Sequence, residues 1–419
     1  MNRNVFTLCV AGAVLAVAAA GCQEARQAPG KQQTVTEIPF RDHSIEGRYI
    51  VMFSQEAIPA SKSYEPVFTD RSQKTAWSEA QTREITASIN RLLRKHRIGP
   101  DQISAYYTAA FTGFVADLTR EEALLLANLP EVESVEYDEE VFLDPVEAEV
   151  VELRDAARAE TIPCGITAVG GSADGSASQA WIWIVDSGID LDHPDLNVVT
   201  NTTYARTYVG GTPDDCNGHG THVAGTAAAR NQGSGVVGVS AGAAVVPVRV
   251  FGCSGGSATS TILSGINHVA ANDLAGDVMN LSLGGYFGSG CATSSTYRTA
   301  VTSVANGGTH VAIAAGNSAA NAALYQPACI NGTRIYTIAS MTCAGAFSSS
   351  FSNFGAPPVD WIAPGSSILS TYLNGGYATL SGTSMATPHV AGILHQRNAA
   401  PAQCGTVSYG GVSYRRACR

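Results

Sequence analysis

Three short stretches of the sequence place an acid, a histidine and a serine where chemistry is expected. Ser384 lies in segment 381–392, between a glycine turn and a run of small residues typical of a helix. Asp186 follows the apolar run 181–185, which has the length of a strand, and His219 lies between two glycines that open a second small-residue run. A serine hydroxyl becomes a nucleophile when a positioned histidine accepts its proton, and an acid can hold the tautomer of that histidine. The sequence therefore predicts nucleophilic catalysis by Ser384.

Each of these residues also has an ordinary structural explanation. A serine in this setting can cap a helix, an aspartate can cap the end of a strand, and a histidine can be a packed loop residue. Found together in the order Asp186, His219, Ser384, they favour a catalytic triad, because no single structural explanation accounts for the combination. His222 lies three residues after His219, as metal ligands can, but no zinc-protease pattern accompanies it and we interpret it as structural.

The sequence resembles the subtilisin-like serine peptidases, most closely their proteinase K branch, over residues 161–396. A fourth motif supports the resemblance, since the apolar run 311–315 is followed by Gly316 and Asn317. The resemblance implies that Ser384 attacks the scissile carbonyl to form an acyl-enzyme, and that Asn317 and the Ser384 backbone N–H bind the oxyanion. It also implies hydrolysis of proteins and peptides, with no cofactor required for the chemistry.

The elements that must position these residues alternate along residues 161–419. Apolar runs of strand length are separated by helix-length segments rich in small residues, in a region large enough for one well-buried domain. This alternation predicts an α/β fold with a mainly parallel sheet covered by helices on both faces. The expected strands are 182–185, 244–250, 278–283, 311–315 and 335–339, and the expected helices are 219–230, 260–272, 294–306 and 384–396.

Two glycine-containing loops resemble the family's two segments that hold an extended peptide substrate. Backbone pairing along such segments gives affinity for peptides of many sequences. The pocket for the residue before the cut should lie beside the second loop, and its wall carries no charge, so we expect a preference for apolar or aromatic residues with broad tolerance. Turns alone also favour glycine at such positions. The residues concerned are Gly255, Gly256 and Ser257 in the first loop, Leu283, Gly284 and Gly285 in the second, and Ala314, Ala315 and Gly316 in the wall.

A smaller α/β domain is predicted over residues 47–143. Thr119 and Glu122 have the spacing of a capping box that opens a helix. The words Thr-Gly-Phe at 112–114 and the alternating Val and Glu at 132–136 resemble the subtilisin propeptide/inhibitor family. An unrelated ferredoxin-like module is the alternative, but the position directly before the catalytic region favours an intramolecular inhibitor. The expected strands are 48–53, 111–118 and 132–138, and the expected first helix is 82–96.

The first residues of the chain have the pattern of an export signal. Residues 1–21 carry an Arg, a short apolar stretch and an Ala-rich end, too short to span a bilayer. The sequence from Ala19 to Cys22 resembles a bacterial lipobox, although Ala19 stands where Leu is usual. The resemblance predicts a lipid on Cys22 that anchors the precursor to a membrane, and simple cleavage near Ala20 with free secretion is the alternative. Residues 22–46 are polar and are predicted to be a flexible tether.

Charge is distributed unevenly along the chain. Of 35 Asp and Glu residues, ten Asp and no Glu lie from Thr161 onward, so 25 precede it, and no Lys follows Thr161. The negative charge therefore lies mainly before the catalytic domain, and no basic patch suggests nucleic acid as a partner. Residues 144–160 are predicted to be an acidic linker with helical tendency that contains the processing site. A monomer is expected.

Cysteine use agrees with export. Apart from Cys9 and Cys22, the sequence has an even set without close pairs, which favours disulfides over metal ligands. The resemblance pairs Cys216 with Cys253, as in some thermostable relatives. Cys404 and Cys418 are a reasonable local pair, while three pairings of the other four stay open. The eight residues are Cys164, Cys216, Cys253, Cys291, Cys329, Cys343, Cys404 and Cys418.

Two further features concern the second half of the chain. Asp360 lies in a segment that resembles a calcium-binding segment of the family, in which backbone carbonyls, here those of Thr333 and Ile335, complete the site. A turn residue is the alternative explanation for Asp360. From Arg397 to Arg419 the sequence carries turn formers, where the family usually continues its helix and adds another.

Overall fold

The structure is a computed structural model that describes residues 34–58, 66–143, 149–151, 160–288, 291 and 295–419. Every element below lies in the compact unit Thr36–Arg419. The predicted signal segment and residues 22–33 of the predicted tether, Cys22 included, lie outside the described residues. Within the described part of the chain, no helix combines the length and the apolar character needed to cross a bilayer.

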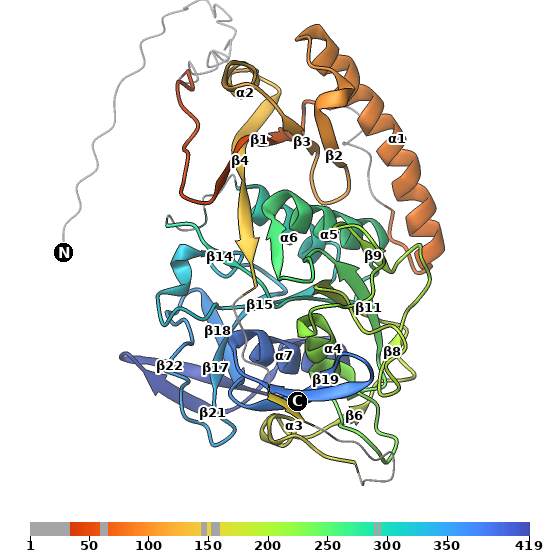
Figure 1. Cartoon of the computed structure of the whole chain (residues 1–419), viewed down its shortest axis with the longest axis vertical. Helices are drawn as coiled ribbons and strands as arrows, with labels where there is room; N and C mark the ends of the chain where they lie inside the picture. Colours follow the sequence, from red (N-terminus) through yellow and green to blue (C-terminus); the bar gives the residue numbers. More distant parts are fainter. Residues whose placement is uncertain (1–33, 59–65, 144–148, 152–159, 289–290, 292–294) are drawn as a thin grey trace, which may run out of the picture. The chain divides into compact units, whose positions relative to one another are not determined.

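The N-terminal domain, residues 44–143, is built on an antiparallel sheet with the strand order β4-β1-β3-β2 (Figure 1). Its strands are β1 (Ser44–Phe53), β2 (Ile103–Tyr107), β3 (Gly113–Asp117) and β4 (Val132–Phe142), and its helices are α1 (Arg71–Lys95), α2 (Arg120–Ala127) and the 3-10 turn η2 (Pro100–Gln102). The two α-helices bury their apolar sides in one core with this sheet.

The helices of this domain start where capping groups satisfy their first N–H donors. The capping box of Thr119 and Glu122 is confirmed, since the Thr119 hydroxyl accepts from the Glu122 N–H and Glu122 accepts from the Thr119 N–H. Helix α1 begins earlier than the predicted start at Thr82. Asp70 caps it by accepting from the Gln73 N–H at 3.1 Å, and its first turns bury polar side chains that carry no apolar periodicity.

The catalytic domain, residues 160–419, is organised by one long sheet. Its strand order is β21-β22-β18-β17-β15-β13-β7-β11-β8, with β9 also paired to β11. Neighbours from β8 to β22 run parallel, which confirms the predicted α/β class. The sheet strands are β7 (Ile182–Asp186), β8 (Asn197–Val198), β9 (Arg206–Thr207), β11 (Ala244–Arg249), β13 (Val278–Leu281), β15 (His310–Ala314), β17 (Ile335–Met341), β18 (Val359–Pro364), β21 (Ala402–Tyr409) and β22 (Val412–Cys418).

Both faces of this sheet are covered. Along β7, Ile182 and Ile184 join a core cluster with helices α4 and α7, while Trp183 and Val185 join a second cluster with α5 and α6. Successive side chains of a strand point to opposite faces, so an all-apolar strand is explained by burial on both sides. The helices are α3 (Cys164–Ala168), α4 (His219–Ala228), α5 (Thr259–Asn272), α6 (Thr296–Asn306), α7 (Thr383–Arg397) and the 3-10 turn η3 (Ala322–Leu324).

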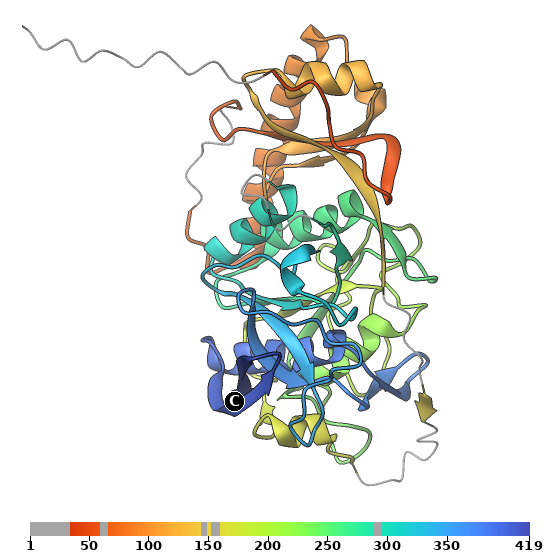
Figure 2. The same cartoon turned by 90° about the vertical axis from the view of Figure 1, so that its left-hand side faces the viewer.

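Smaller sheets lie around the central one. The catalytic-domain strand β12 pairs with β4 of the N-terminal domain, and β5, from the segment between the domains, pairs with β20. Figure 2 shows β4 running from the N-terminal domain to the catalytic domain. The strands of these sheets are β5 (Glu149–Val151), β6 (Ala173–Asp174), β10 (Ser240–Ala241), β12 (Gly256–Ala258), β14 (Gly285–Tyr286), β16 (Tyr325–Gln326), β19 (Ile368–Tyr372) and β20 (Gly376–Leu380).

The segment between the domains differs from its prediction as a linker with helical tendency. Within the predicted linker, Glu149–Val151 forms strand β5, and just before the linker Val141 and Phe142 continue strand β4 beyond the predicted strand 132–138. Both stretches are extended because edges of the catalytic domain offer them backbone partners, which a single sequence does not reveal. Residues 144–148 and 152–159 lie outside the described part of the chain.

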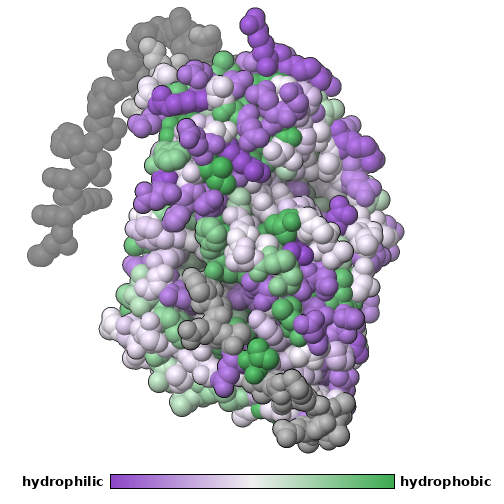
Figure 3. All heavy atoms as spheres, viewed as in Figure 1, coloured by the Kyte–Doolittle hydropathy of each residue, from purple (hydrophilic) through white to green (hydrophobic). Residues whose placement is uncertain are grey.

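Polar residues gather over the N-terminal domain on the face drawn in Figure 3, where its elements lie at the top. The catalytic domain below shows a more mixed surface on that face. This distribution agrees with the position of 25 of the 35 acidic residues before Thr161.

The last residues of the chain extend the central sheet. Strands β21 and β22 form an antiparallel hairpin, and β22 pairs in parallel with β18. Val407 and Tyr414 enter a core cluster with Ala339 and Ile362, and the Tyr414 hydroxyl accepts from the Gly355 N–H at 2.9 Å. The hairpin therefore covers this end of the core, where the resemblance implied further helix.

We expect Tyr414→Ala to lower the free energy of unfolding by about 3–5 kcal/mol, because it leaves a cavity under the hairpin. The ring is only 2% exposed. Urea unfolding of the inactive Ser384→Ala chain measures the change, and Ser413→Ala, at an exposed site on the same strand, is the control. Equal stability of the two variants would contradict a packing role for the hairpin.

Candidate active site

The pairing of Asp186 with His219 is the best-defined part of the site. Asp186 ends β7 and His219 begins α4, and the His219 Nδ1 lies 2.8 Å from the Asp186 Oδ1. Both side chains are buried. Gly218 precedes the histidine with φ +100°, and a Cβ there would overlap the ring of Tyr372. Glycine is therefore required for the chain to turn into α4 at this point.

Ser384 lies at the second residue of α7, past the carboxyl end of β13. Its hydroxyl donates to the Ser282 carbonyl at 3.2 Å, and the Ser282 hydroxyl donates to the Ser384 carbonyl at 2.9 Å. Since β13 is the direct neighbour of β7, Ser384 and Asp186 lie at the same edge of the sheet. Helix α7 packs against α4 in one core cluster. The sheet thus brings the serine to the edge from which α4 presents His219.

Asn317 follows β15, the next strand of the sheet. Its Oδ1 accepts from the Thr383 N–H at 2.8 Å and from the Thr383 hydroxyl at 2.9 Å. These bonds fix the rotation of the amide, and they direct its NH₂ group away from Thr383. Asn317 and Ser384 line the same cavity. An amide held in this way is suited to donate a hydrogen bond to negative charge that develops beside Ser384.

That cavity has a volume of about 200 Å³ and contains the predicted substrate pocket. The predicted residues line it, together with aromatic residues that the sequence reasoning missed. Two of the missed residues follow the glycine loop and the third lies in β16, the strand paired with β14, so no common motif marks them. The expected lining residues are Leu283, Gly284, Gly285, Ala314, Ala315 and Gly316, and the additional ones include Tyr286, Phe287 and Tyr325.

The end of β4 occupies the other side of the cavity. Phe142 pairs with Gly256 and Val141 with Ser257 in an antiparallel ladder. The Leu143 N–H donates to the Gly255 carbonyl at 2.9 Å, and Val141, Phe142 and Leu143 all line the cavity. The predicted first loop therefore binds an extended segment of this same chain through its backbone.

Asp215 organises the loop before His219, and sequence reasoning missed it. Its Oδ1 accepts from the N–H groups of Asn217 and Gly218, both at 2.9 Å, and its Oδ2 accepts from Thr221. Burial raises the pKa of Asp215, whereas these hydrogen bonds favour its charged form. The available signal was the turn-forming run from Asp214 to Gly218, in which Asp and Asn side chains commonly bond the following N–H groups.

His222 lies in the interior next to the site. Its Nε2 is 2.9 Å from the Ile368 carbonyl and 3.1 Å from the Ala378 carbonyl, so Nε2 must carry the proton. Burial lowers the pKa of His222 to about 3. These contacts explain a neutral structural histidine that joins α4 to the β19–β20 hairpin.

The eight cysteines form four disulfides in the structure. Cys216 is bonded to Cys253, which ties the loop before His219 to the loop that contains Gly255. Cys404 is bonded to Cys418 across the terminal hairpin. The pairings that the sequence left open are Cys164–Cys343 and Cys291–Cys329.

Asp360, the predicted calcium ligand, already makes contacts within the protein. The residue lies in strand β18, not in a turn, and its Oδ2 accepts from the Thr337 N–H at 2.9 Å. Burial raises the pKa of the Asp360 carboxyl, and the charge of Arg415 has a smaller, lowering effect. The Arg415 guanidinium donates a hydrogen bond to the backbone carbonyl of Asp360 at 3.2 Å. Among the described residues, no three His, Cys, Asp or Glu side chains gather in a metal-binding group.

Comparison with known families agrees with this geometry. The model of the subtilase family matches residues 178–403, and the model of the peptidase inhibitor I9 family matches residues 48–144. The first match covers more than half of the chain. The chain belongs to the subtilase family, and a domain of the peptidase inhibitor I9 family precedes the region that the subtilase model matches.

Several characterised proteases are similar to the chain. Alkaline serine exoprotease A of Vibrio alginolyticus is 35% identical over 88% of this chain and 64% of its own length. The Extracellular serine proteinase of Thermus sp. (strain Rt41A) is 33% identical over 83% of this chain and 79% of its own length. The chain thus spans slightly less than two thirds of the first relative. A crystal structure of a cold adapted subtilisin-like serine proteinase is 37% identical, covers 54% of this chain and 77% of its own, and has a TM-score of 0.46.

Asn317→Ala should lower kcat by about 10²–10³-fold with little change in KM, because it removes one donor to the oxyanion. The mature enzyme is assayed with a chromogenic peptide, and Asn331→Ala, at an exposed asparagine, is the control. If kcat of Asn317→Ala stays within about twofold of wild type, Asn317 has no part in stabilising the transition state.

Proposed function

We propose that the chain is the precursor of a secreted serine endopeptidase, which it releases by cutting itself between the two domains. The observation that carries this proposal is the position of the end of β4. Its residues pair with β12 and line the cavity that also contains Ser384 and Asn317. An extended backbone beside a serine nucleophile is the arrangement that a peptide substrate requires.

The proposed reaction uses each residue at a defined atom. The Ser384 Oγ attacks the scissile carbonyl carbon and transfers its proton to the Nε2 of His219, while Asp186 holds the Nδ1–H tautomer. The oxyanion accepts hydrogen bonds from the Asn317 amide and the Ser384 N–H. Collapse breaks the C–N bond, and the leaving amine takes the proton from His219. Water then attacks the Ser384 ester while His219 takes its proton, the C–Oγ bond breaks, His219 returns the proton to the Ser384 Oγ, and the acid product leaves.

The N-terminal domain acts in this proposal as an inhibitor in the same chain. Besides the contact of β4 with β12, its carboxylates cap two helices of the catalytic domain. Asp138 accepts from the Ser260 N–H at 2.9 Å near the start of α5, and Glu136 accepts from the Thr296 N–H at 3.2 Å at the start of α6. Negative side chains are favoured at helix N-termini. These contacts support a domain that docks on α5 and α6 and fills the cleft.

The substrate preference follows from the pocket. Its wall of Leu283, Ala314 and Ala315 offers apolar surface and no charge, so we expect apolar or aromatic residues before the cut. Comparison of peptides with Phe or Lys at that position tests this, and a preference for Lys would refute it.

A calcium site at Asp360, Thr333 and Ile335 also stays a prediction. It fails if calcium raises the melting temperature of Asp360→Asn as much as that of wild type.

Export of the precursor and a lipid on Cys22 complete the proposal. The name of the Thermus relative describes that protein as extracellular, and the pattern of residues 1–21 supports export of this one. If Cys22 carries a lipid, cutting between the domains also separates the enzyme from its anchor. The mature enzyme is proposed to act as a monomer.

The Ser384→Ala chain should accumulate as an uncut precursor, because the nucleophile for its own cut is missing. Wild type should yield a soluble product that begins between Asp144 and Cys164. Expression of both chains, with Ser350→Ala at an exposed serine as control, is followed by fractionation and N-terminal sequencing. A cut product from Ser384→Ala would assign the processing to another protease, and a wild-type product still bound to membranes would refute release.

A further inference from the structure

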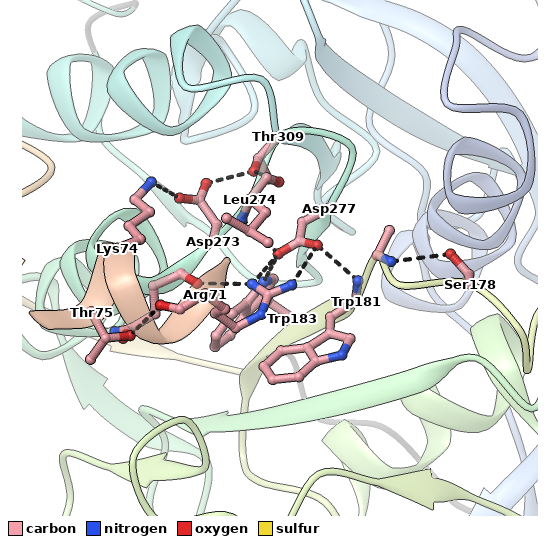
Figure 4. A network of polar contacts seen from close by, with 12 residues as sticks. Arg71, Lys74, Thr75, Ser178, Trp181, Trp183, Asp273, Leu274, Asp277 and Thr309 are labelled. Atoms are coloured by element: carbon pink, nitrogen blue, oxygen red, sulfur yellow. Dashed lines mark hydrogen bonds and ion pairs between the residues drawn. The ribbon is translucent and has the colours of Figure 1, made fainter. Parts of the chain in front are cut away.

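The first turns of α1 bury two cationic side chains against the catalytic domain. Arg71 is 8% exposed and Lys74 is 6% exposed, although both belong to residue types that normally lie in solvent. Figure 4 shows both side chains pointing from α1 toward the acidic residues that follow α5. These contacts lie outside the cleft and outside the helix caps of Glu136 and Asp138.

The guanidinium of Arg71 contacts a carboxylate, a backbone carbonyl and an aromatic ring of the catalytic domain. Its Nη1 donates to the Asp277 Oδ2 at 2.6 Å and its Nη2 to the Asp277 Oδ1 at 3.0 Å, while Nη1 also donates to the Asn272 carbonyl at 2.8 Å. The guanidinium carbon lies 3.8 Å from the ring centre of Trp181. A two-pronged carboxylate and an aromatic face are the groups that distinguish arginine from lysine.

The catalytic domain holds this site in place by itself. Asp277 accepts from the Trp181 N–H at 2.9 Å, from the Trp183 Nε1–H at 2.8 Å and from the Leu274 N–H at 3.1 Å. All three donors belong to the catalytic domain, so the carboxylate keeps its orientation whether or not Arg71 is bound. A preorganised partner loses little entropy when its ligand binds.

A second ion pair lies one turn further along α1. The Lys74 Nζ is 2.6 Å from the Asp273 Oδ1, and the Thr309 hydroxyl donates to the Asp273 Oδ2. Burial raises the pKa of Asp273 to about 6, while the charge of Lys74 acts in the opposite direction. The Thr75 hydroxyl adds a hydrogen bond of 2.7 Å to the Asn272 Oδ1. The start of α1 thus docks through several charge-assisted contacts in one place.

This docking point lies at the opposite edge of the sheet from the cleft. Trp181 precedes β7 and Asp277 precedes β13, whereas Asp186 ends β7 and Ser282 follows β13. Because the two strands are parallel neighbours, their amino ends share one edge and their carboxyl ends share the other. The N-terminal domain therefore contacts both edges, with α1 at one and the end of β4 at the other.

We propose that Trp181, Asp277 and the Asn272 carbonyl form an arginine-binding exosite, which anchors the N-terminal domain through Arg71 and keeps it docked after the chain is cut at the cleft. A cut frees the end of β4 but leaves the contacts at the other edge unchanged. The persistence after cutting rests on the proposed self-processing, whereas the exosite itself does not. Release of the inhibitor is then limited by the departure of Arg71 from its site.

The exosite is tested first in the uncut full chain, which carries Ser384→Ala. Hydrogen exchange is measured for the segments 71–81 and 272–281 in Arg71→Ala, in Arg71→Lys and in Arg83→Ala, which changes an exposed arginine of the same helix. Removing one partner of a buried ion pair is strongly destabilising, so Arg71→Ala should speed exchange in both segments by at least about tenfold. Arg71→Lys should resemble Arg71→Ala, since lysine lacks the two-pronged geometry. Arg83→Ala should match the parent chain.

If exchange in Arg71→Ala matches that in Arg83→Ala, the exosite is refuted. Trp181→Leu changes the exosite on the catalytic domain and leaves α1 unaltered. It should increase exchange in the same two segments, which would show that the effect of Arg71→Ala does not come from misfolding of the helix.

The same substitutions are then made with Ser384 intact, and the amount of N-terminal domain that co-elutes with the cut enzyme is followed over time. Arg71→Ala should shorten its retention at least about tenfold, and unchanged retention would refute the anchoring role. Absence of any cut would refute the proposed function, while the exchange measurement would still decide the exosite.

Discussion

The parallel pairing of β7 with its neighbours is the constraint on which the candidate site depends. Parallel strands end together, so residues far apart in the sequence reach one edge without any contact between their own segments. Asp186 ends β7, Ser282 follows β13 and Asn317 follows β15. A slip of one strand would move its terminal side chain along the edge and would also exchange the faces of its core residues. Burial on both faces of the sheet therefore fixes the geometry of the site.

The N-terminal domain uses the same framework from outside. Its carboxylates accept hydrogen bonds at the starts of α5 and α6, and the end of β4 pairs with β12. Helix α1 contacts Asp277, at the end of the sheet where the parallel strands begin. Inhibition and anchoring are thus separable in space, because the cleft and the arginine site lie at opposite ends of the same strands.

Much of the site could be predicted because its signals are local. Apolar runs followed by Asp186 or Asn317, and glycines beside His219 and Ser384, mark strand ends and helix starts directly in the sequence. The capping box at Thr119 is local for the same reason. Strand and helix positions in the catalytic domain followed from burial on both faces, which produces continuous apolar runs.

The features that were missed depend on partners distant in the sequence. The start of α1 carries no apolar stripe, because Arg71 and Lys74 are buried by acidic residues about two hundred positions later. The terminal hairpin pairs with β18, so its turn formers did not indicate that it extends the sheet. The end of β4 pairs with β12 and β5 pairs with β20, so the acidic composition between the domains did not indicate strands. Cys164 and Cys343 are 179 residues apart, and only the fold brings them together. Asp360 lies in a strand whose other residues are buried, and not in the turn that was the alternative explanation.

Covalent labelling of the mature enzyme tests the central claim most directly. A serine-directed fluorophosphonate reacts only with a serine whose proton is removed by a positioned base. The account predicts, by mass spectrometry of peptides, one adduct on Ser384 that disappears in an enzyme carrying His219→Ala, produced by cutting its precursor with an added protease. An unmodified Ser384 in folded mature protein, or labelling that is unaffected by the loss of His219, would contradict it.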